Sequence, residues 1–176
     1  MSSISPGKGI ARLSGNSQGE KVQSDRDFAD AFDAAHAKLR AAIDSACSDG
    51  DRWETKVVAA VVAVLDLAAA DPATARLLTA GAFDYGIYGA LRYRRMVDGI
   101  ASQLALGREL EQAPANLPGL IEEALVGGVA EILAGRLRSG REAELPALAG
   151  EVSELLLTPY LGATGARRVI VEERHT

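Results

Sequence analysis

Residues 53–72 have the sequence WETKVVAAVVAVLDLAAADP. Its apolar residues recur at the spacing of one helix face, and that face comprises Trp53, Val57, Val61, Val64, Leu65 and Ala68. Val58, Val62 and Leu67 widen the face, so the predicted helix is buried on most sides. The many valines would also suit a strand. The run is long and does not alternate between apolar and polar residues, however, which favours a helix.

The last two residues of this stretch are a boundary between helices. Asp71 is a good N-cap, because its carboxylate can accept a bond from a free backbone N–H. Pro72 suits the first helical position, where its missing N–H would have no partner in any case. The sequence therefore predicts that one helix ends here and a short one begins.

The same apolar spacing predicts helices on both sides of the central stretch. They run from an N-cap at Ser24 to Cys47, from Pro72 to near Gly81, from Phe83 to Leu106, from Leu117 to Leu137 and from Glu142 onward, with Pro159 expected to kink or end the last one. Neither a hairpin signal nor a repeat array accompanies them. We therefore expect an all-α bundle of about six helices.

The chain is expected to have three parts. Residues 1–23 are rich in Ser and Gly and show no periodic apolar pattern, which is typical of a flexible leader. Residues 24–168 form the helical body, and residues 169–176 form a charged tail. The most apolar run, 57–70, is shorter than the roughly 20 residues that span a bilayer. No signal peptide is recognisable, so we expect a cytoplasmic protein without membrane contact.

Composition excludes several classes of function. The 176 residues are 48% hydrophobic and carry a net charge of −5, which argues against disorder and against a protein that coats nucleic acid. The single cysteine, Cys47, excludes an internal disulfide and a multi-cysteine zinc site. No nucleophile, metal or paired-carboxylate motif is present, so we expect no enzyme activity, no metal and no cofactor.

Several segments, in order, resemble the C-terminal ligand-binding and dimerisation region of TetR-type transcriptional regulators. They are Trp53 followed by Leu67–Ala73 and Ala75–Leu78, then Glu122–Leu133, then Leu145–Leu148 with Leu155–Gly162. The resemblance covers about four fifths of the chain, although no single segment is diagnostic. It implies a protein that senses a small molecule and forms a homodimer.

One part of the TetR pattern is not recognisable. Those regulators carry a three-helix DNA-binding domain before the helix that corresponds to the one containing Phe28. Here the preceding residues are the Gly/Ser-rich leader, which has no recognition-helix pattern and few basic residues. We therefore expect DNA binding only if a helix-turn-helix is supplied by a missing N-terminus or by a partner.

The resemblance implies two sets of functional residues. A two-fold interface would use the last two long helices, through Ala124, Gly128, Ile132, Gly135, Val152, Leu155, Leu156 and Tyr160. An apolar ligand would lie among Phe32, Trp53, Leu77, Tyr85, Tyr88, Tyr93, Met96 and Leu120. Each of these residues is also explained by ordinary core packing.

A second function stays open. The chain could be a helical adaptor or structural protein with a filled core, which binds a protein partner (such as a complete TetR-type regulator) and no small molecule. His36 and the cluster of Arg92, Arg94 and Arg95 are best explained as structural or solvated residues, and Cys47 as a small core residue.

Overall fold

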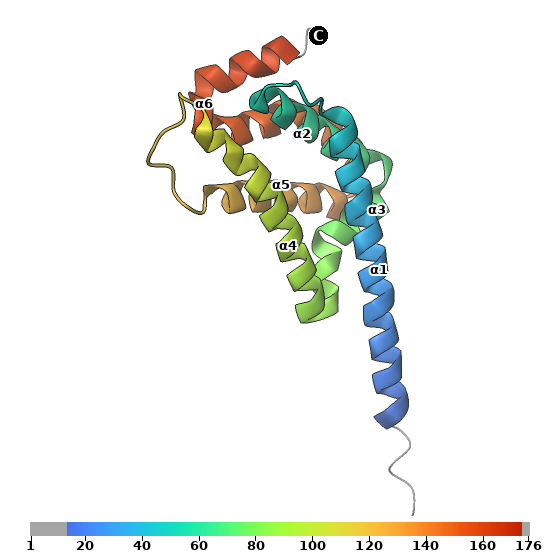
Figure 1. Ribbon diagram of the computed structural model, residues 1–176. Helices are drawn as coiled ribbons and strands as arrows, with labels where there is room; N and C mark the ends of the chain where they lie inside the picture. Colours follow the sequence, from blue (N-terminus) through green and yellow to red (C-terminus); the bar gives the residue numbers. More distant parts are fainter. Residues whose placement is uncertain (1–13, 174–176) are drawn as a thin grey trace, which may run out of the picture.

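The computed structural model describes residues 14–173, which fold as helices without any strand (Figure 1). The α-helices are α1 (Ser14–Ala46), α2 (Trp53–Ala70), α3 (Pro72–Leu78), α4 (Gly86–Leu104), α5 (Ile121–Arg138) and α6 (Ala149–Glu173). Short 3-10 helices are η1 (Ala80–Tyr85), η2 (Ala105–Glu109) and η3 (Glu142–Leu148). The expected all-α helical bundle is confirmed. Residues 1–13 of the predicted leader and residues 174–176 of the predicted tail lie outside the described residues.

Helix α2 packs against α1, α6, η3 and α3 (Figure 1). Its Val61, Leu65 and Ala68 are buried, and Leu65 is only 1% exposed. These residues join a large cluster with side chains of α3, α4, α5, η3 and α6. The predicted helix face is therefore the centre of the main core.

A second buried cluster joins α1 to α3, η1 and α4. Its largest members are Phe28, Phe32, Leu39 and Met96. Several partly buried side chains, Tyr93 among them, touch both clusters. The two clusters therefore form one continuous apolar interior.

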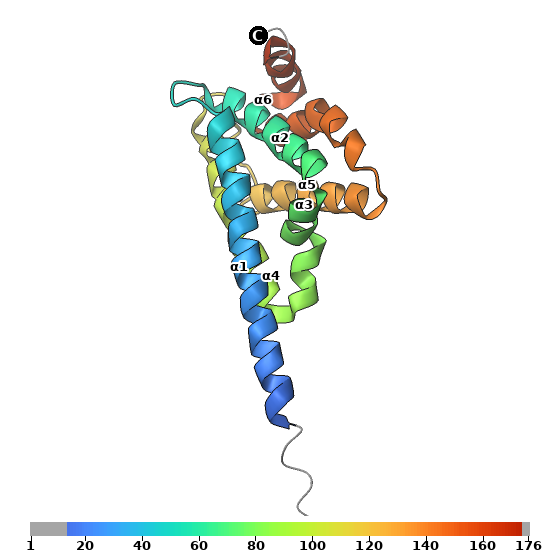
Figure 2. The same ribbon diagram turned by 90° about the vertical axis from the view of Figure 1, so that its right-hand side faces the viewer.

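Helix α1 is longer than its apolar pattern predicts. It begins at Ser14 rather than at Ser24, so residues 14–23 of the predicted leader are helical. Figures 1 and 2 show this end of α1 projecting past the rest of the bundle. The side chains of Lys21, Val22 and Gln23 are exposed. An apolar pattern did not reveal this extension, because residues 14–23 are mostly polar or glycine and carry no apolar residues at helical spacing.

The predicted helix from Phe83 to Leu106 is divided in the structure. Gly86 has φ 59° and ψ −137°, and this conformation separates η1 from α4. Gly89 then lies against Ala82, where an added Cβ would be 1.8 Å from the carbonyl oxygen. These two glycines allow η1 and the start of α4 to pack closely together at one end of the bundle, which we call the tip (Figure 2).

The last helix also departs from the prediction. Residues 142–148 form a 3-10 helix before α6 begins, and α6 continues through Pro159 and turns instead at Gly162. Gly162 has φ 66° and ψ 164°, a conformation that is nearly restricted to glycine. After this turn the helix continues to Glu173, and Val169 and Ile170 are buried. The start of the predicted charged tail is therefore part of the core.

The predicted boundary at Asp71 and Pro72 is confirmed. The Asp71 carboxylate accepts hydrogen bonds from the backbone N–H of Thr74, at 3.1 Å, and from its hydroxyl, at 2.8 Å. Lys38 of α1 also binds this carboxylate. The hydrogen bond from Lys38, followed by those from Thr74, lowers the pKa of Asp71 from 3.8 to about 2.

We predict that replacing Asp71 with Asn destabilises the protein in a pH-dependent way. A pKa that is lower in the folded state contributes stability above the unfolded value, and this is lost as the pH falls from about 4 to about 2. Urea midpoints of Asp71→Asn and the native chain should therefore differ at pH 6 and converge near pH 2. Asp66→Asn, an exposed position on α2, is the control. A difference that stays constant with pH would contradict the role of this carboxylate.

Candidate functional site

A groove of about 530 Å³ lies where α1 passes α3 and the tip. Its volume is within the range of small-molecule sites. Polar and apolar side chains both line it, and they are Gln23, Ser24, Asp27, Phe28, Ala31, Leu77 and Tyr85. Helix α1 therefore supplies most of the lining, on one face of its projecting half.

Aromatic rings form the apolar wall of this groove. Tyr85 of η1 stacks on Phe28 of α1, with ring centroids 3.9 Å apart and planes 15° apart. Phe28 also contacts Phe32, at a centroid distance of 5.8 Å. Because Phe28 is only 3% exposed while Tyr85 is 36% exposed, the stack connects the groove with the second buried cluster.

The structure brings together five of the eight residues expected to bind a ligand. Leu77 and Tyr85 line the groove. Phe32 and Met96 are buried in the second cluster, and Tyr93 packs against that cluster. Burial raises the pKa of the Tyr93 hydroxyl. The groove also contains polar residues that the sequence interpretation missed, above all Asp27, because nothing in the sequence distinguishes this carboxylate from other surface charges.

The other three expected ligand residues lie elsewhere. Tyr88 is 60% exposed and Leu120 is 69% exposed. Trp53 packs at the opposite end of the core, beside α6. These residues do not line the groove.

The tip carries an unusual concentration of exposed apolar side chains. We call it the tip patch, and it consists of Phe83, Tyr85, Ile87, Tyr88 and Leu91. Ile87, at 68%, is the most exposed of them. Such a concentration of exposed apolar side chains within residues 83–91 is typical of binding sites for proteins or ligands.

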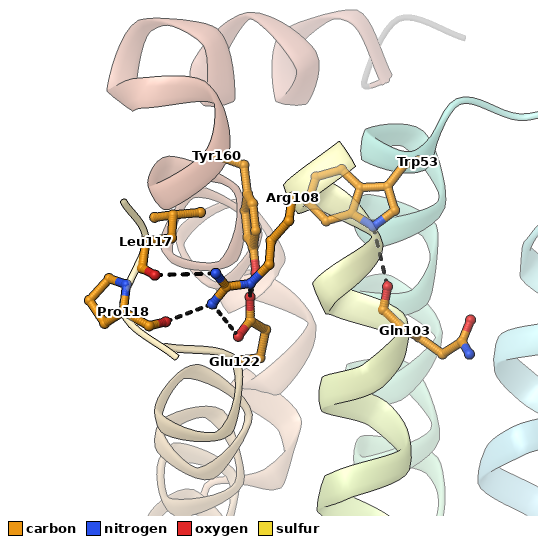
Figure 3. Close-up of polar contacts among 7 residues, drawn as sticks. All are labelled: Trp53, Gln103, Arg108, Leu117, Pro118, Glu122 and Tyr160. Carbon is orange, nitrogen blue, oxygen red and sulfur yellow. Dashed lines mark hydrogen bonds and ion pairs between the residues drawn. The ribbon is translucent and has the colours of Figure 1, made fainter. Parts of the chain in front are cut away.

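A second candidate site is the buried carboxylate of Glu122, in the first turn of α5 (Figure 3). Arg108 donates to both of its oxygens, from Nε to Oε1 at 2.7 Å and from Nη2 to Oε2 at 2.9 Å. The Tyr160 hydroxyl donates to Oε1 at 2.9 Å. Glu122 is 5% exposed and Tyr160 is fully buried, so the charge depends on these partners.

Arg108 also fixes the loop that precedes α5. It donates to the carbonyl oxygens of Leu117, at 3.2 Å, and Pro118, at 2.6 Å (Figure 3). Leu117 thus lies in a loop, and the helix predicted to start there begins at Ile121. The guanidinium therefore satisfies two backbone carbonyl groups of this loop, which lie outside the helix.

Trp53 continues this cluster toward α2. Its ring meets Tyr160 edge to face, with centroids 5.0 Å apart, and its Nε1 donates to the Gln103 carbonyl at 3.4 Å (Figure 3). Gly107 lies against the indole, and an added Cβ there would be 2.4 Å from Trp53 Cζ2. The cluster therefore joins α2, α4, η2, α5 and α6.

The electrostatics of this cluster keep both groups in one protonation state. The hydrogen bonds from Arg108 lower the pKa of Glu122, whereas burial and the bond to Glu122 raise the pKa of Tyr160. Both carboxylate oxygens are occupied by protein donors. The cluster therefore fixes the positions of helices. Sequence interpretation missed it, because Glu122 and Glu123 look alike in the sequence.

The residues expected at a dimer interface divide into two groups. Ala124, Gly128, Ile132 and Leu155 lie on exposed surface, where Ile132 is 39% and Leu155 42% exposed. Val152, Leu156 and Tyr160 are buried within the single chain, and Gly135 is partly buried. Beside the exposed group a groove of about 400 Å³ is lined by Leu125, Glu151, Glu154, Leu155, Thr158 and Pro159.

Three other residues set apart in the sequence have ordinary surroundings. Cys47 is partly buried, and burial raises the pKa of its thiol, which makes it less reactive. Arg92 forms an ion pair with Asp33, and Arg94 forms ion pairs with Asp98 and Glu123. Arg94 is exposed, as expected of a solvated helix face, whereas Arg92 is half-buried.

Among residues 14–173 no three His, Cys, Asp or Glu side chains gather as a metal site would require. In the same range no single helix is long and apolar enough to cross a membrane; α2 and α3 reach that length only together, bent by 114°. Comparisons with protein-family models, curated proteins and solved structures found no match.

We predict that Glu122→Gln destabilises the fold by about 2–3 kcal/mol, because it leaves the Arg108 guanidinium facing a neutral amide. The matched control is Glu123→Gln, the next residue, whose partner Arg94 is exposed. Its expected cost is within about 0.5 kcal/mol, as for other surface ion pairs. Urea unfolding monitored by circular dichroism measures both. Equal losses of unfolding free energy in the two variants would show that the buried ion pair contributes no more than a surface pair.

We also predict that Gly107→Ala costs about 1–3 kcal/mol, because the new methyl group overlaps the Trp53 ring. Gly99→Ala is the control: a Cβ there meets no atom within 4 Å, and alanine favours the helix by up to about 1 kcal/mol. The midpoint of thermal unfolding should therefore fall for Gly107→Ala and rise for Gly99→Ala. A Gly107→Ala protein as stable as the native chain would refute the close packing at Trp53.

Proposed function

We propose that this protein is a cytoplasmic helical module that binds an apolar small molecule and forms a homodimer, like the sensing region of TetR-type regulators. The groove over the Phe28–Tyr85 stack is the observation that carries the proposal. An apolar, aromatic wall with a few polar groups is the usual construction of a small-molecule site.

The groove is also connected with the rest of the molecule through packed helices. Tyr85 belongs to η1, and η1 packs on α4, which packs on α5. A ligand that pushes on Tyr85 would therefore act on the helices that connect the groove with the dimer surface. Coupling of this kind is what a sensing module requires, because a ligand shifts a protein only through contacts that differ between its states.

Dimerisation is supported by the exposed surface of α5 and α6. Ala124 and Gly128 leave room for the close approach of a second backbone, while Ile132 and Leu155 offer apolar side chains. A two-fold contact would bring each of these residues against the same surface of the partner. We assign no catalytic role to the protein. Any effect on DNA would need a helix-turn-helix supplied by a partner.

A specific observation also favours the adaptor function. The tip patch exposes five large apolar residues within a short segment, and a protein partner could cover them. The two functions differ in one observable. A sensing module is stabilised against heat by a neutral apolar compound such as N-phenyl-1-naphthylamine, whereas an adaptor with a filled core is not.

We predict that the purified chain is a dimer at micromolar concentration and that Ile132→Asp weakens it at least about tenfold in Kd, because a charge is then buried at the two-fold contact. Val62→Asp is the matched control: Val62 is also 39% exposed but lies on α2. Sedimentation velocity measures both variants. A monomeric native chain, or equal effects of the two substitutions, would rule out this interface.

A further inference from the structure

The tip patch is an apolar surface that the described part of the chain leaves uncovered. Its members Ile87 and Tyr88 are 68% and 60% exposed, and Phe83 is 56% exposed. Apolar surface in contact with water costs free energy, which a covering segment would recover. Tyr85 of the patch stacks on Phe28 of α1, so the patch adjoins this helix where it begins to project (Figure 2). A segment that follows α1 would therefore meet the patch.

The projecting half of α1, residues 14–27, has little packing of its own among its described side chains. Those of residues 21–27 are all exposed or partly exposed, and Val22 is 51% exposed. The sequence of this half includes Gly15, Gly19 and three serines, which are weak helix formers. A single helix of this length and composition is marginally stable in water unless another segment packs along it. One segment that lies along α1 and ends on the tip patch would cover both surfaces.

Residues 1–13, which lie outside the described residues, are joined to α1 at Ser14 and are long enough to return to the tip patch. Ser14 and Phe28 are about 21 Å apart along the helix, at a rise of about 1.5 Å per residue. From Ser14 an extended chain covers about 33 Å by Ile4 but only about 13 Å by Ile10. Ile4 is therefore within reach of the tip patch, with length to spare for the reversal of the chain, whereas Ile10 reaches only the projecting half.

The charges of the two surfaces are complementary. Residues 1–13 carry Lys8 and Arg12 and no acidic residue. The opposing segments, residues 21–31 and 83–91, together contain four acidic and two basic residues, so their net charge is negative. Opposite net charges favour this contact over the same contact between two acidic surfaces, and they fix its orientation.

We propose that residues 1–13 fold back along the projecting half of α1 and that Ile4 covers part of the tip patch. The inference goes beyond the proposed function, because it assigns an exposed surface of the molecule to a segment of the chain itself. A protein partner that binds the tip patch has to displace this segment first. The segment thereby limits access to the tip.

Disulfide cross-linking of the full chain tests this contact. Cys47→Ala removes the single native cysteine, and Ser3→Cys places a thiol beside Ile4 without replacing it. Ile87→Cys supplies the second thiol, on the tip patch. Electrophoresis without reductant then measures how fast the internal disulfide forms in a glutathione buffer.

The matched control replaces Ile87→Cys by Arg26→Cys. Arg26 is exposed and lies about as far from Ser14 as the tip patch does, but it is two residues, or about 200°, around the helix from Phe28. A docked segment should form the disulfide with Ile87→Cys at least about tenfold faster than with Arg26→Cys, because docking raises the effective concentration at one position only. Equal rates would show a segment that is not docked and would overturn the inference.

Two further substitutions test Ile4 as the residue that holds the segment. Ile4→Asp, added to Ser3→Cys and Ile87→Cys, should slow the disulfide to the rate of the Arg26→Cys control. Ser5→Asp makes the same change of charge and should slow it by less than about threefold, as for one solvated charge. Equal slowing by the two substitutions would contradict the inference. Disulfides that form between two copies faster than within one would identify a second copy as the occupant and would also overturn it.

Discussion

The ion pair between Glu122 and Arg108 holds η2, α5 and α6 together through one buried charge. A carboxylate buried in an apolar body is costly unless it is paired and hydrogen-bonded. Glu122 meets this condition with two bonds from Arg108 and one from Tyr160. Because these residues come from η2, α5 and α6, satisfying one charge fixes the relative positions of three segments. The edge-to-face contact between Trp53 and Tyr160 also packs α2 against this cluster.

Much of the fold could be predicted from the sequence. Apolar spacing revealed α2, and the pair Asp71 and Pro72 marked its end, since helix burial and capping leave local patterns. The turn at Gly162 was assigned instead to Pro159. A proline removes one hydrogen bond, which a helix surface can tolerate, whereas the actual turn requires a conformation that only glycine adopts easily. The early start of α1 at Ser14 leaves no apolar signal at all.

The candidate site was predicted less well, because it depends on which helices meet. Leu77 and Tyr85 were expected near a ligand, but Asp27 was not, since nothing local distinguishes a carboxylate beside a groove from one in solvent. For the same reason Glu122 and Glu123 could not be told apart, although one is buried and the other pairs with an exposed arginine. The residues predicted for the dimer interface include exposed ones such as Ile132 and core ones such as Val152.

We propose that the molecule has two separate binding surfaces, one for a ligand and one for a second copy of the chain. Hydrogen–deuterium exchange of the full chain tests both at once, because bound surfaces exchange more slowly. Raising the protein concentration should slow exchange in α5 and the first half of α6, and adding N-phenyl-1-naphthylamine should slow it in residues 21–31 and in η1. Exchange that slows with concentration at the tip instead, or that does not respond to the ligand in these segments, would contradict the account.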